Sequence, residues 1–179
     1  MSHAPRAAAL LRSVGLDPRG PVIWGTPLPE RGPGVYVIET STALASAPID
    51  TAAVAGWLAR VPGLALDGRR PTSRDLTERL ASFWIPDETV VYIGLAGTSL
   101  RTRVRQYYDT PLGDRRPHAG GHWLKALSIV PELRVWWAAT DVPSGKEEEL
   151  LNAFAATSGT AGRRSGLLLP FANLETAQK

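Results

Sequence analysis

The stretch Thr89-Val-Val-Tyr-Ile-Gly-Leu95 decides the expected fold, because it is an uncharged run of β-branched and aromatic residues. A similar run, Gly34-Val-Tyr-Val-Ile-Glu-Thr40, lies upstream, and Leu133 to Thr140 forms a third run that contains two adjacent tryptophans. Runs of this composition and length are typical of buried strands. The three runs predict a small three-stranded antiparallel sheet.

Helical patterns surround these runs. Helices are expected over 6–14, 52–60, from a cap at Ser73, from Ser99 to about 108, over 122–127 and over 146–156. The Pro- and Gly-rich residues 18–33 predict an irregular lead-in, 109–121 a loop, 159–166 a polar connector and 167–173 an apolar closing segment. The expected fold class is α+β: a small three-stranded antiparallel sheet flanked by helices, with a helical insertion at 41–88 between strands one and two. The N-terminal helix and lead-in occupy 1–33, and a single domain occupies 34–179.

Composition limits the class of protein. Apolar residues make up 44% of the chain and charged residues 21%, which are ordinary globular values. The chain contains no cysteine, so disulfides and cysteine-based zinc sites are excluded and a reducing compartment is favoured. No apolar run approaches the length of a membrane span. A cytoplasmic protein without a membrane partner is therefore expected.

Positive charge gathers in one part of the sequence. Residues 100–125 carry six basic side chains against Asp109 and Asp114, a local charge of six minus two, or +4, whereas the whole chain has +3. Such a patch attracts phosphate backbones through counterion release, although a solvated helix face is the ordinary alternative. Arg103 is singled out below, and the other five basic residues are the candidate nucleic-acid contacts: Arg101, Arg105, Arg115, Arg116 and Lys125.

Arg103 differs from its basic neighbours in its place on the expected helix. Leu100, Val104 and Tyr107 form one apolar stripe with spacings of four and three. Arg103 lies at the border of this stripe, where an arginine buries its stem and holds its guanidinium over a cleft. The planar guanidinium matches the oxygens of a phosphate. A plain surface arginine is the competing interpretation.

Two signatures and several later residues follow a recognisable order. Gly34-Val-Tyr36 and Tyr92-Ile-Gly94 each pair a tyrosine with a glycine two positions away on an expected strand. Downstream stand Leu100, Arg103, Tyr107, His118, Glu147-Glu-Glu-Leu150-Leu151, Phe154 and Pro170-Phe-Ala-Asn173. Each motif is short, but their number and order resemble the GIY-YIG nuclease family over residues 34–40 and 89–173.

The resemblance implies a metal-dependent endonuclease that hydrolyses phosphodiester bonds, with DNA favoured over RNA as the partner. Glu147 would be the protein ligand of one divalent cation, Mg²⁺ or Mn²⁺, because magnesium needs only one or two carboxylates and keeps several waters. Arg103 would add a fixed positive charge near the scissile phosphate. The water nucleophile would be served by a group of four residues, namely Tyr36, Tyr92, Tyr107 and His118. Asn173 would orient neighbouring groups without transferring a proton.

The identity of the general base stays open at this point. Tyrosine is a poor base at its ordinary pKa of about 10. Either a tyrosine pKa lowered by the cation and Arg103, or a relay through His118, would be required.

Purely structural interpretations of the same residues compete with these catalytic roles. Ser144-Gly-Lys-Glu147 has the pattern of a capping box, so Glu147 could serve only the start of a helix. Tyr36 and Tyr92 could be ordinary core tyrosines. His118 and His122 have a zinc-binding spacing, but the two glycines between them argue against the helix that such a site needs.

The sequence also departs from the family. Family members place the two signatures close together, whereas Tyr36 and Tyr92 are 56 positions apart here, so the insertion at 41–88 is a candidate for substrate selection. Leu95 stands where the repair-type members carry a lysine. Two alternatives remain: a catalytically weak nucleic-acid-binding module on the same fold, and an enzyme for a small non-nucleic substrate. The oligomeric state is open.

Overall fold

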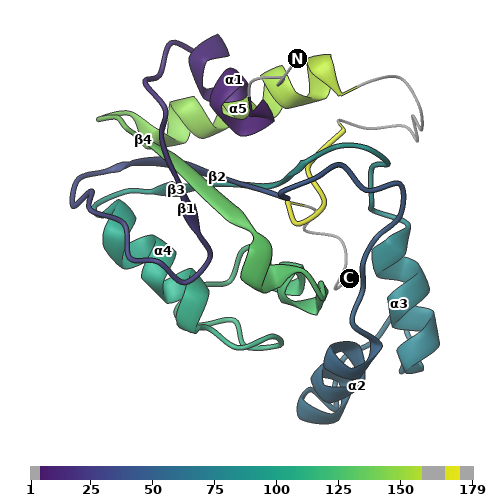
Figure 1. Cartoon of the computed structure of the whole chain (residues 1–179). Helices are drawn as coiled ribbons and strands as arrows, with labels where there is room; N and C mark the ends of the chain where they lie inside the picture. The colour runs from purple at the N-terminus through teal and green to yellow at the C-terminus, as the bar shows by residue number, and fades with distance from the viewer. Residues whose placement is uncertain (1–4, 159–167, 174–179) are drawn as a thin grey trace.

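A computed structural model describes residues 5–158 and 168–173, and the connector expected at 159–166 lies outside these residues. Its centre is a four-stranded antiparallel sheet in the order β1-β4-β2-β3 (Figure 1). The strands are β1 (Arg19–Ile23), β2 (Gly34–Glu39), β3 (Val90–Ala96) and β4 (Arg134–Ala139). The α+β class is confirmed, and the prediction of three strands is wrong.

The additional strand is β1, which comes from the expected irregular lead-in. Its sequence Arg-Gly-Pro-Val-Ile contains a glycine and a proline, which disfavour strands, so its residue pattern did not predict a strand. β1 pairs with β4 alone and has a register irregularity between Arg19 and Val22. Proline lacks a backbone donor and is therefore tolerated at an edge or a bulge. Pro21 occupies such a position, so the edge location makes this sequence compatible with a strand.

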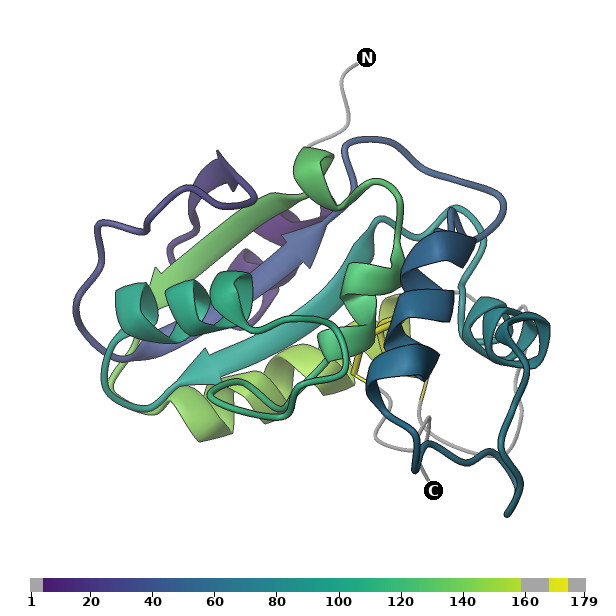
Figure 2. The same cartoon turned by 90° about the horizontal axis from the view of Figure 1, so that it is seen from below.

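Alternation along the strands divides the core between the two faces of the sheet. Tyr36, Ile38 and Tyr92 belong to the cluster on one face, and Val37 and Ile93 to the cluster on the other. Helices α1 (Arg6–Ser13) and α5 (Pro143–Thr157) cover the second face. Helix α4 (Leu100–Asp109) and the 3₁₀ helix η1 (His122–Ala126) cover the first face, as Figure 2 shows from below. A short 3₁₀ turn, η2 (Val130–Glu132), precedes β4.

The insertion between β2 and β3 forms two helices, α2 (Thr51–Arg60) and α3 (Ser73–Ala81). Trp57, Leu76 and Leu80 belong to the same buried cluster as Tyr36. The sequence predicted Ser73 as the cap of α3, and this prediction is wrong. The cap is Thr72, because Thr72 and Asp75 bond each other's backbone amides in a capping box. The insertion therefore adds to the core beside the sheet.

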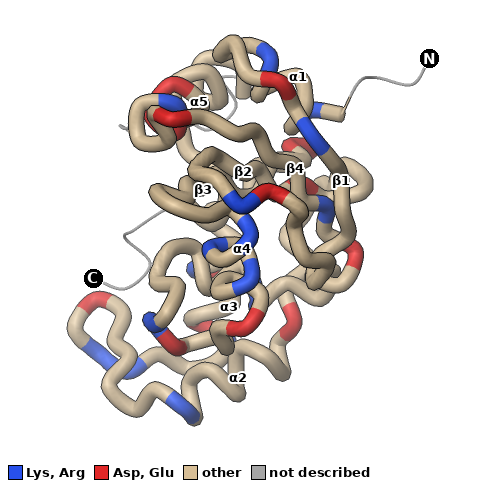
Figure 3. Tube along the Cα trace, turned by 90° about the vertical axis from the view of Figure 1, so that its left-hand side faces the viewer, with Lys and Arg blue, Asp and Glu red and all other residues tan. Residues whose placement is uncertain are grey.

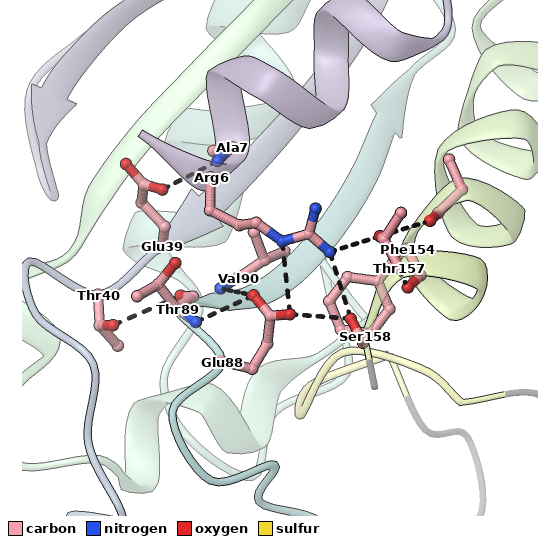
Figure 4. A network of polar contacts seen from close by, with 11 residues as sticks. Arg6, Ala7, Glu39, Thr40, Glu88, Thr89, Val90, Phe154, Thr157 and Ser158 are labelled. Atoms are coloured by element: carbon pink, nitrogen blue, oxygen red, sulfur yellow. Dashed lines mark hydrogen bonds and ion pairs between the residues drawn. The ribbon is translucent and has the colours of Figure 1, made fainter. Parts of the chain in front are cut away.

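A partly buried polar network joins the layer of α1 and α5 to the sheet (Figure 4). Glu39 is 2% exposed and accepts a hydrogen bond from the Ala7 amide at 3.0 Å. Arg6 approaches Glu88 at 3.6 Å, and Ser158 donates to the same carboxylate at 2.8 Å. These contacts satisfy polar groups at the start of α1, at the end of α5, at the end of β2 and just before β3.

None of the helices formed by residues 5–158 and 168–173 has both the length and the apolar character needed to cross a membrane.

Candidate functional site

The two signature tyrosines lie side by side on the α4 face of the sheet. The register pairs Tyr36 with Gly94 and Ile38 with Tyr92, so both phenols leave the same face of adjacent strands. Their ring centroids are 5.9 Å apart. A Cβ at Gly94 would lie 2.7 Å from the Tyr36 hydroxyl and 2.7 Å from Cε1 of Tyr92. The glycine of the second signature therefore makes the space that the tyrosine of the first signature occupies.

His118 connects these phenols to α4. Its Nε2 lies 2.9 Å from the Tyr36 hydroxyl, and its ring stacks on Tyr107 with centroids 4.1 Å apart and an interplanar angle of 2°. Tyr107 in turn donates to the Gly121 carbonyl at 2.6 Å. Tyr36, Tyr107 and His118 are at most 1% exposed, whereas Tyr92 is 6% exposed. Tyr92 is thus the phenol of this cluster with most access to solvent.

Burial sets the protonation of the cluster. It raises the pKa of Tyr36 and of Tyr107 well above the ordinary tyrosine value. Burial also raises the pKa of Tyr92 to about 12, with opposing influences from the Tyr36 hydroxyl and Arg103. For His118, burial and then the positive charges of Arg103 and Lys125 lower the pKa to about 3. At neutral pH the phenols are protonated and the imidazole is neutral, and in the tautomer with its proton on Nδ1 the imidazole accepts the Tyr36 hydroxyl proton at Nε2.

Arg103, Tyr92 and Glu147 line one groove of about 340 Å³ at the C-terminal end of β3 and the start of α4. Arg103 is half-buried, and its Nη1 donates to the Pro117 carbonyl at 3.3 Å. The loop that carries His118 therefore also holds the guanidinium. Helix α4 begins at the N-cap Ser99, whose hydroxyl accepts from the Thr102 amide, as the sequence predicted.

Glu147 is available for a role in this groove, because it does not cap its helix. Helix α5 begins at Pro143, its N-cap Val142 makes no side-chain cap, and Ser144 lies inside the helix. The capping-box reading is therefore wrong, since the proline at the first helical position moves the start of the helix upstream. Burial raises the pKa of the Glu147 carboxyl, and Arg103 acts in the opposite direction.

The fit of a divalent cation can be judged from the groups around Glu147. The carboxylate is half-buried and makes no hydrogen bond or ion pair with another residue among 5–158 and 168–173. In the same part of the chain no group of three or more His, Cys, Asp or Glu could hold a metal. A half-buried carboxylate without a protein partner fits a hard cation whose other ligands are water and substrate oxygens.

Asn173 holds the edge of the sheet next to Tyr92. Its side chain accepts from the Ile93 amide at 2.8 Å and donates to the Ile93 carbonyl at 2.7 Å. The Ala172 amide also donates to the Val91 carbonyl at 2.8 Å. The closing segment thus occupies the open hydrogen-bonding edge of β3, and the geometry gives Asn173 a positioning part.

The candidate nucleic-acid contacts do not share one environment. Figure 3 shows basic positions along α4, where Arg101 and Arg105 are exposed and Arg105 approaches Asp109 at 3.4 Å. Arg115 and Arg116 are exposed on the following loop. Lys125 is different: it is half-buried, and its ammonium donates to the carbonyls of Tyr108 and Thr110 at the end of α4. Lys125 therefore belongs to the structure of the helix end and is removed from the candidate contacts.

Sequence analysis missed the importance of two adjacent glycines. A Cβ at Gly121 would lie 2.6 Å from Cε2 of Tyr92 and 2.8 Å from the Tyr107 hydroxyl, and the residue has a φ of +62°. A Cβ at Gly120 would lie 2.8 Å from the Tyr92 hydroxyl. The Gly-Gly pair was visible in the sequence, but only as the mark of a loop. Its function is to let the loop press against the tyrosines.

The structure brings the seven candidate catalytic residues into one neighbourhood, although they come from separate parts of the chain. Tyr36, Tyr107 and His118 form its buried side, and Tyr92 separates that side from the groove. Arg103 and Glu147 line the groove, and Asn173 bonds the backbone of Ile93, next to Tyr92. No protein-family description, curated protein or solved structure matches the chain.

Proposed function

We propose that this chain is a metal-dependent endonuclease of the GIY-YIG type, which hydrolyses phosphodiester bonds and prefers DNA to RNA. The observation that carries the proposal is the groove in which Arg103, Glu147 and Tyr92 meet, backed by the hydrogen bond between Tyr36 and His118. Both signatures lie on adjacent antiparallel strands, and the glycine of one accommodates the tyrosine of the other. This complementarity supports the GIY-YIG-like arrangement that the sequence resembles.

The charges of the groove suit a phosphodiester. Arg103 presents a fixed positive charge, and its bond to the Pro117 carbonyl restricts its position before the substrate arrives. Preorganised charge of this kind stabilises the negative charge that develops on the phosphate oxygens. Tyr92, protonated at neutral pH, presents its hydroxyl oxygen to the attacking water as a hydrogen-bond acceptor.

Of the two ways to activate water, the raised pKa values of Tyr36 and Tyr92 disfavour a tyrosinate base, which leaves the relay. A tyrosine with a raised pKa does not lose its proton to solvent, but it passes a proton along a hydrogen-bonded chain without becoming an anion. Tyr92 takes the proton of the water and gives its own to Tyr36, which gives its hydroxyl proton to Nε2 of His118. Burial is the main cause of the low pKa of His118 in the free protein, and Arg103 and Lys125 add to it; a bound phosphate offsets the charge of Arg103 and thereby raises this pKa.

Glu147 is the residue that would hold the cation. Once bound there, Mg²⁺ or Mn²⁺ would supply Lewis acidity to the phosphate and the leaving oxygen. The carboxylate forms no ion pair among the described residues, so no protein cation competes for its oxygens.

The first prediction concerns Glu147. In a nicking assay on supercoiled plasmid with Mg²⁺ or Mn²⁺, Glu147→Gln should lower the cleavage rate by about 100-fold or more, because it removes the ligand charge and keeps the side-chain size. Glu148→Gln is the matched control, since Glu148 is exposed on the same helix and should cleave as the wild type does.

Plasmid binding distinguishes the binding-module alternative. A nuclease with Glu147→Gln should still bind DNA. If the wild type does not nick and only Arg101→Ala and Arg105→Ala weaken binding, the chain is a binding module. A rate unchanged by Glu147→Gln contradicts the cation site.

A further inference from the structure

A second pocket, of about 600 Å³, shares Tyr92 and Glu147 with the groove that contains Arg103. We call it the side pocket: it lies between the loop at 119–121, the first residues of η1, Leu151 of α5 and the closing residue Ala172. A molecule that fills the side pocket touches the two residues that the proposed function places at the scissile phosphate. Its occupant is therefore a part of the substrate that adjoins this phosphate.

The lining of the side pocket combines flat apolar surface with polar backbone. The aromatic residues His122 and Trp123, which are largely buried, line it together with the aliphatic residues Leu151 and Ala172, and the glycine pair adds wall without side chains. Arg115 adds a positive charge to the wall. The volume lies in the range of small-ligand pockets. A nucleobase, which is a flat ring with polar edges and a phosphate attached through its sugar, matches this combination.

The wall formed by the glycine pair is tightly constrained. A Cβ at Gly120 or Gly121 would collide with Tyr92, so the loop has no space for side chains on that side. His122 continues the wall and is itself buried, so it supports the wall and exposes little surface to the pocket. The pocket is thus preformed and bounded by backbone, which suits recognition of a flat ring.

The insertion supports this wall from behind. The Trp57 ring of α2 packs edge-on against His122, with centroids 5.3 Å apart and an interplanar angle of 85°. The Asp50 amide donates to the Ala126 carbonyl at 2.8 Å, and Ile49 forms a bridge with Leu127. These contacts attach 49–57 to both ends of η1 and to the residue that follows it. The insertion thereby acts on the substrate through the side pocket.

The geometry points to the side pocket as the binding site for the base of an unpaired nucleotide next to the scissile phosphate. This inference rests on the proposed nuclease function and specifies its substrate. A base inside a duplex must be unstacked and unpaired before it can enter such a pocket, and a base that is already unpaired does not have this cost. The preferred substrate is therefore nucleic acid with an unpaired base at the cut.

Three oligonucleotide duplexes of one sequence test this preference in Mg²⁺. One is fully paired, one carries a single bulged nucleotide, and one carries an abasic nucleotide at the bulge. The bulged duplex should be cleaved with a kcat/KM at least about tenfold above the paired duplex. The abasic duplex should lose most of this gain, because it keeps the flexible backbone and lacks the base. Equal rates for the bulged and abasic duplexes overturn the inference.

A variant that fills the side pocket gives an independent test. Ala119 lines the pocket and is exposed on a loop, so Ala119→Trp adds bulk there with little demand on the core. It should lower cleavage of the bulged duplex by about tenfold more than it lowers cleavage of the paired duplex. Ala55→Trp, at an exposed position of α2 that lines no part of the side pocket, should change neither rate. Equal effects of Ala119→Trp on both duplexes contradict the assignment.

Binding without metal separates the two proposals. The bulged base is replaced by 2-aminopurine, and its fluorescence is followed in EDTA. A saturable change that Ala119→Trp abolishes supports the side pocket even if no DNA is cut, in which case only the nuclease proposal fails. Cleavage that depends on Glu147 but shows no preference among the three duplexes, with no fluorescence change, overturns the side pocket and keeps the nuclease.

Discussion

At the scale of single residues, His118 carries the clearest consequence of burial. Its ring is fully buried, stacked on Tyr107 and bonded to the Tyr36 hydroxyl. An imidazole in this setting stays neutral, and the tautomer with its proton on Nδ1 offers Nε2 as an acceptor to the Tyr36 hydroxyl. His118 therefore communicates with the groove through the tyrosines and does not meet solvent directly.

A relay predicts that Tyr36 and His118 act as a unit. Tyr36→Phe and His118→Asn should each lower kcat by about 10² to 10³. The double variant should lose no more kcat than the single variant with the larger loss. Groups that work in one step are non-additive, whereas independent groups multiply their effects. Plasmid nicking rates of the four proteins give the comparison, and a double variant whose loss equals the product of the single losses excludes the relay.

The buried imidazole should also appear in the pH dependence of stability. The pKa of His118 is about 3 in the folded protein, below the unfolded value of about 6.5. As the pH falls, the unfolded chain therefore binds the proton before the folded protein does. The contribution of neutral His118 to the free energy of unfolding is present above pH of about 6.5 and is lost as the pH falls towards 3. The slope reaches up to about 1.4 kcal/mol per pH unit.

Urea denaturation between pH 4.5 and 7.5 measures this slope. His118→Phe should flatten it, because the proton-binding group is gone, while His122 remains and contributes in the same direction. If the free energy of unfolding changes with pH equally in the wild type and in His118→Phe, His118 is not the source of the pH dependence.

At the scale of elements, the pairing of β2 with β3 depends on Gly94. Gly94→Ala should lower the free energy of unfolding by about 1–3 kcal/mol, because the new methyl group would overlap both signature tyrosines in a packed core. Gly56→Ala is the control: Gly56 is exposed in α2 with nothing within 4 Å of a new Cβ, so it should match or exceed the wild type. Chemical denaturation of the three proteins decides, and a Gly94→Ala protein as stable as wild type would contradict the close approach.

For most helices and strands, the local residue pattern was sufficient to predict where the element begins and ends. The helices α1, α2 and α4 and the strands β2, β3 and β4 lie within a few residues of their expected bounds, because apolar period and capping residues are local properties. The start of α5 was expected near Lys146 and lies at Pro143, so a capping box inferred from four residues was misplaced. The structure of the helix start depended on Pro143, which the pattern had not included.

At the scale of the whole molecule, Glu39 ties together segments that are far apart in the chain. Its carboxylate accepts from the Ala7 amide at 3.0 Å and from the Trp136 indole at 2.7 Å, so it joins α1, β2 and β4. Burial raises the pKa of Glu39, opposed by these two hydrogen bonds. The layer of α1 thus depends on one acid inside the protein.

Removal of this acid should destabilise the entire fold. Glu39→Ala leaves two buried donors without an acceptor, which should cost about 2–4 kcal/mol in a urea unfolding experiment at neutral pH. Glu148→Ala, at an exposed site of α5, should unfold at the wild-type urea concentration. A Glu39→Ala protein with wild-type stability would mean that water replaces the carboxylate.

The sequence by itself determined the α+β class, most element positions and the residues of the candidate site, because periodicity, strand composition and motif order are all local or linear properties. Only the tertiary structure decided that Arg19–Ile23 is a strand, since its neighbour β4 and its edge position outweigh its proline. The tertiary structure likewise decided that Lys125 serves the end of α4, that Glu147 does not cap its helix, and that Gly120 and Gly121 wall a pocket. The reason is physical: burial, hydrogen-bond partners and close approach are set by segments that lie far away along the chain.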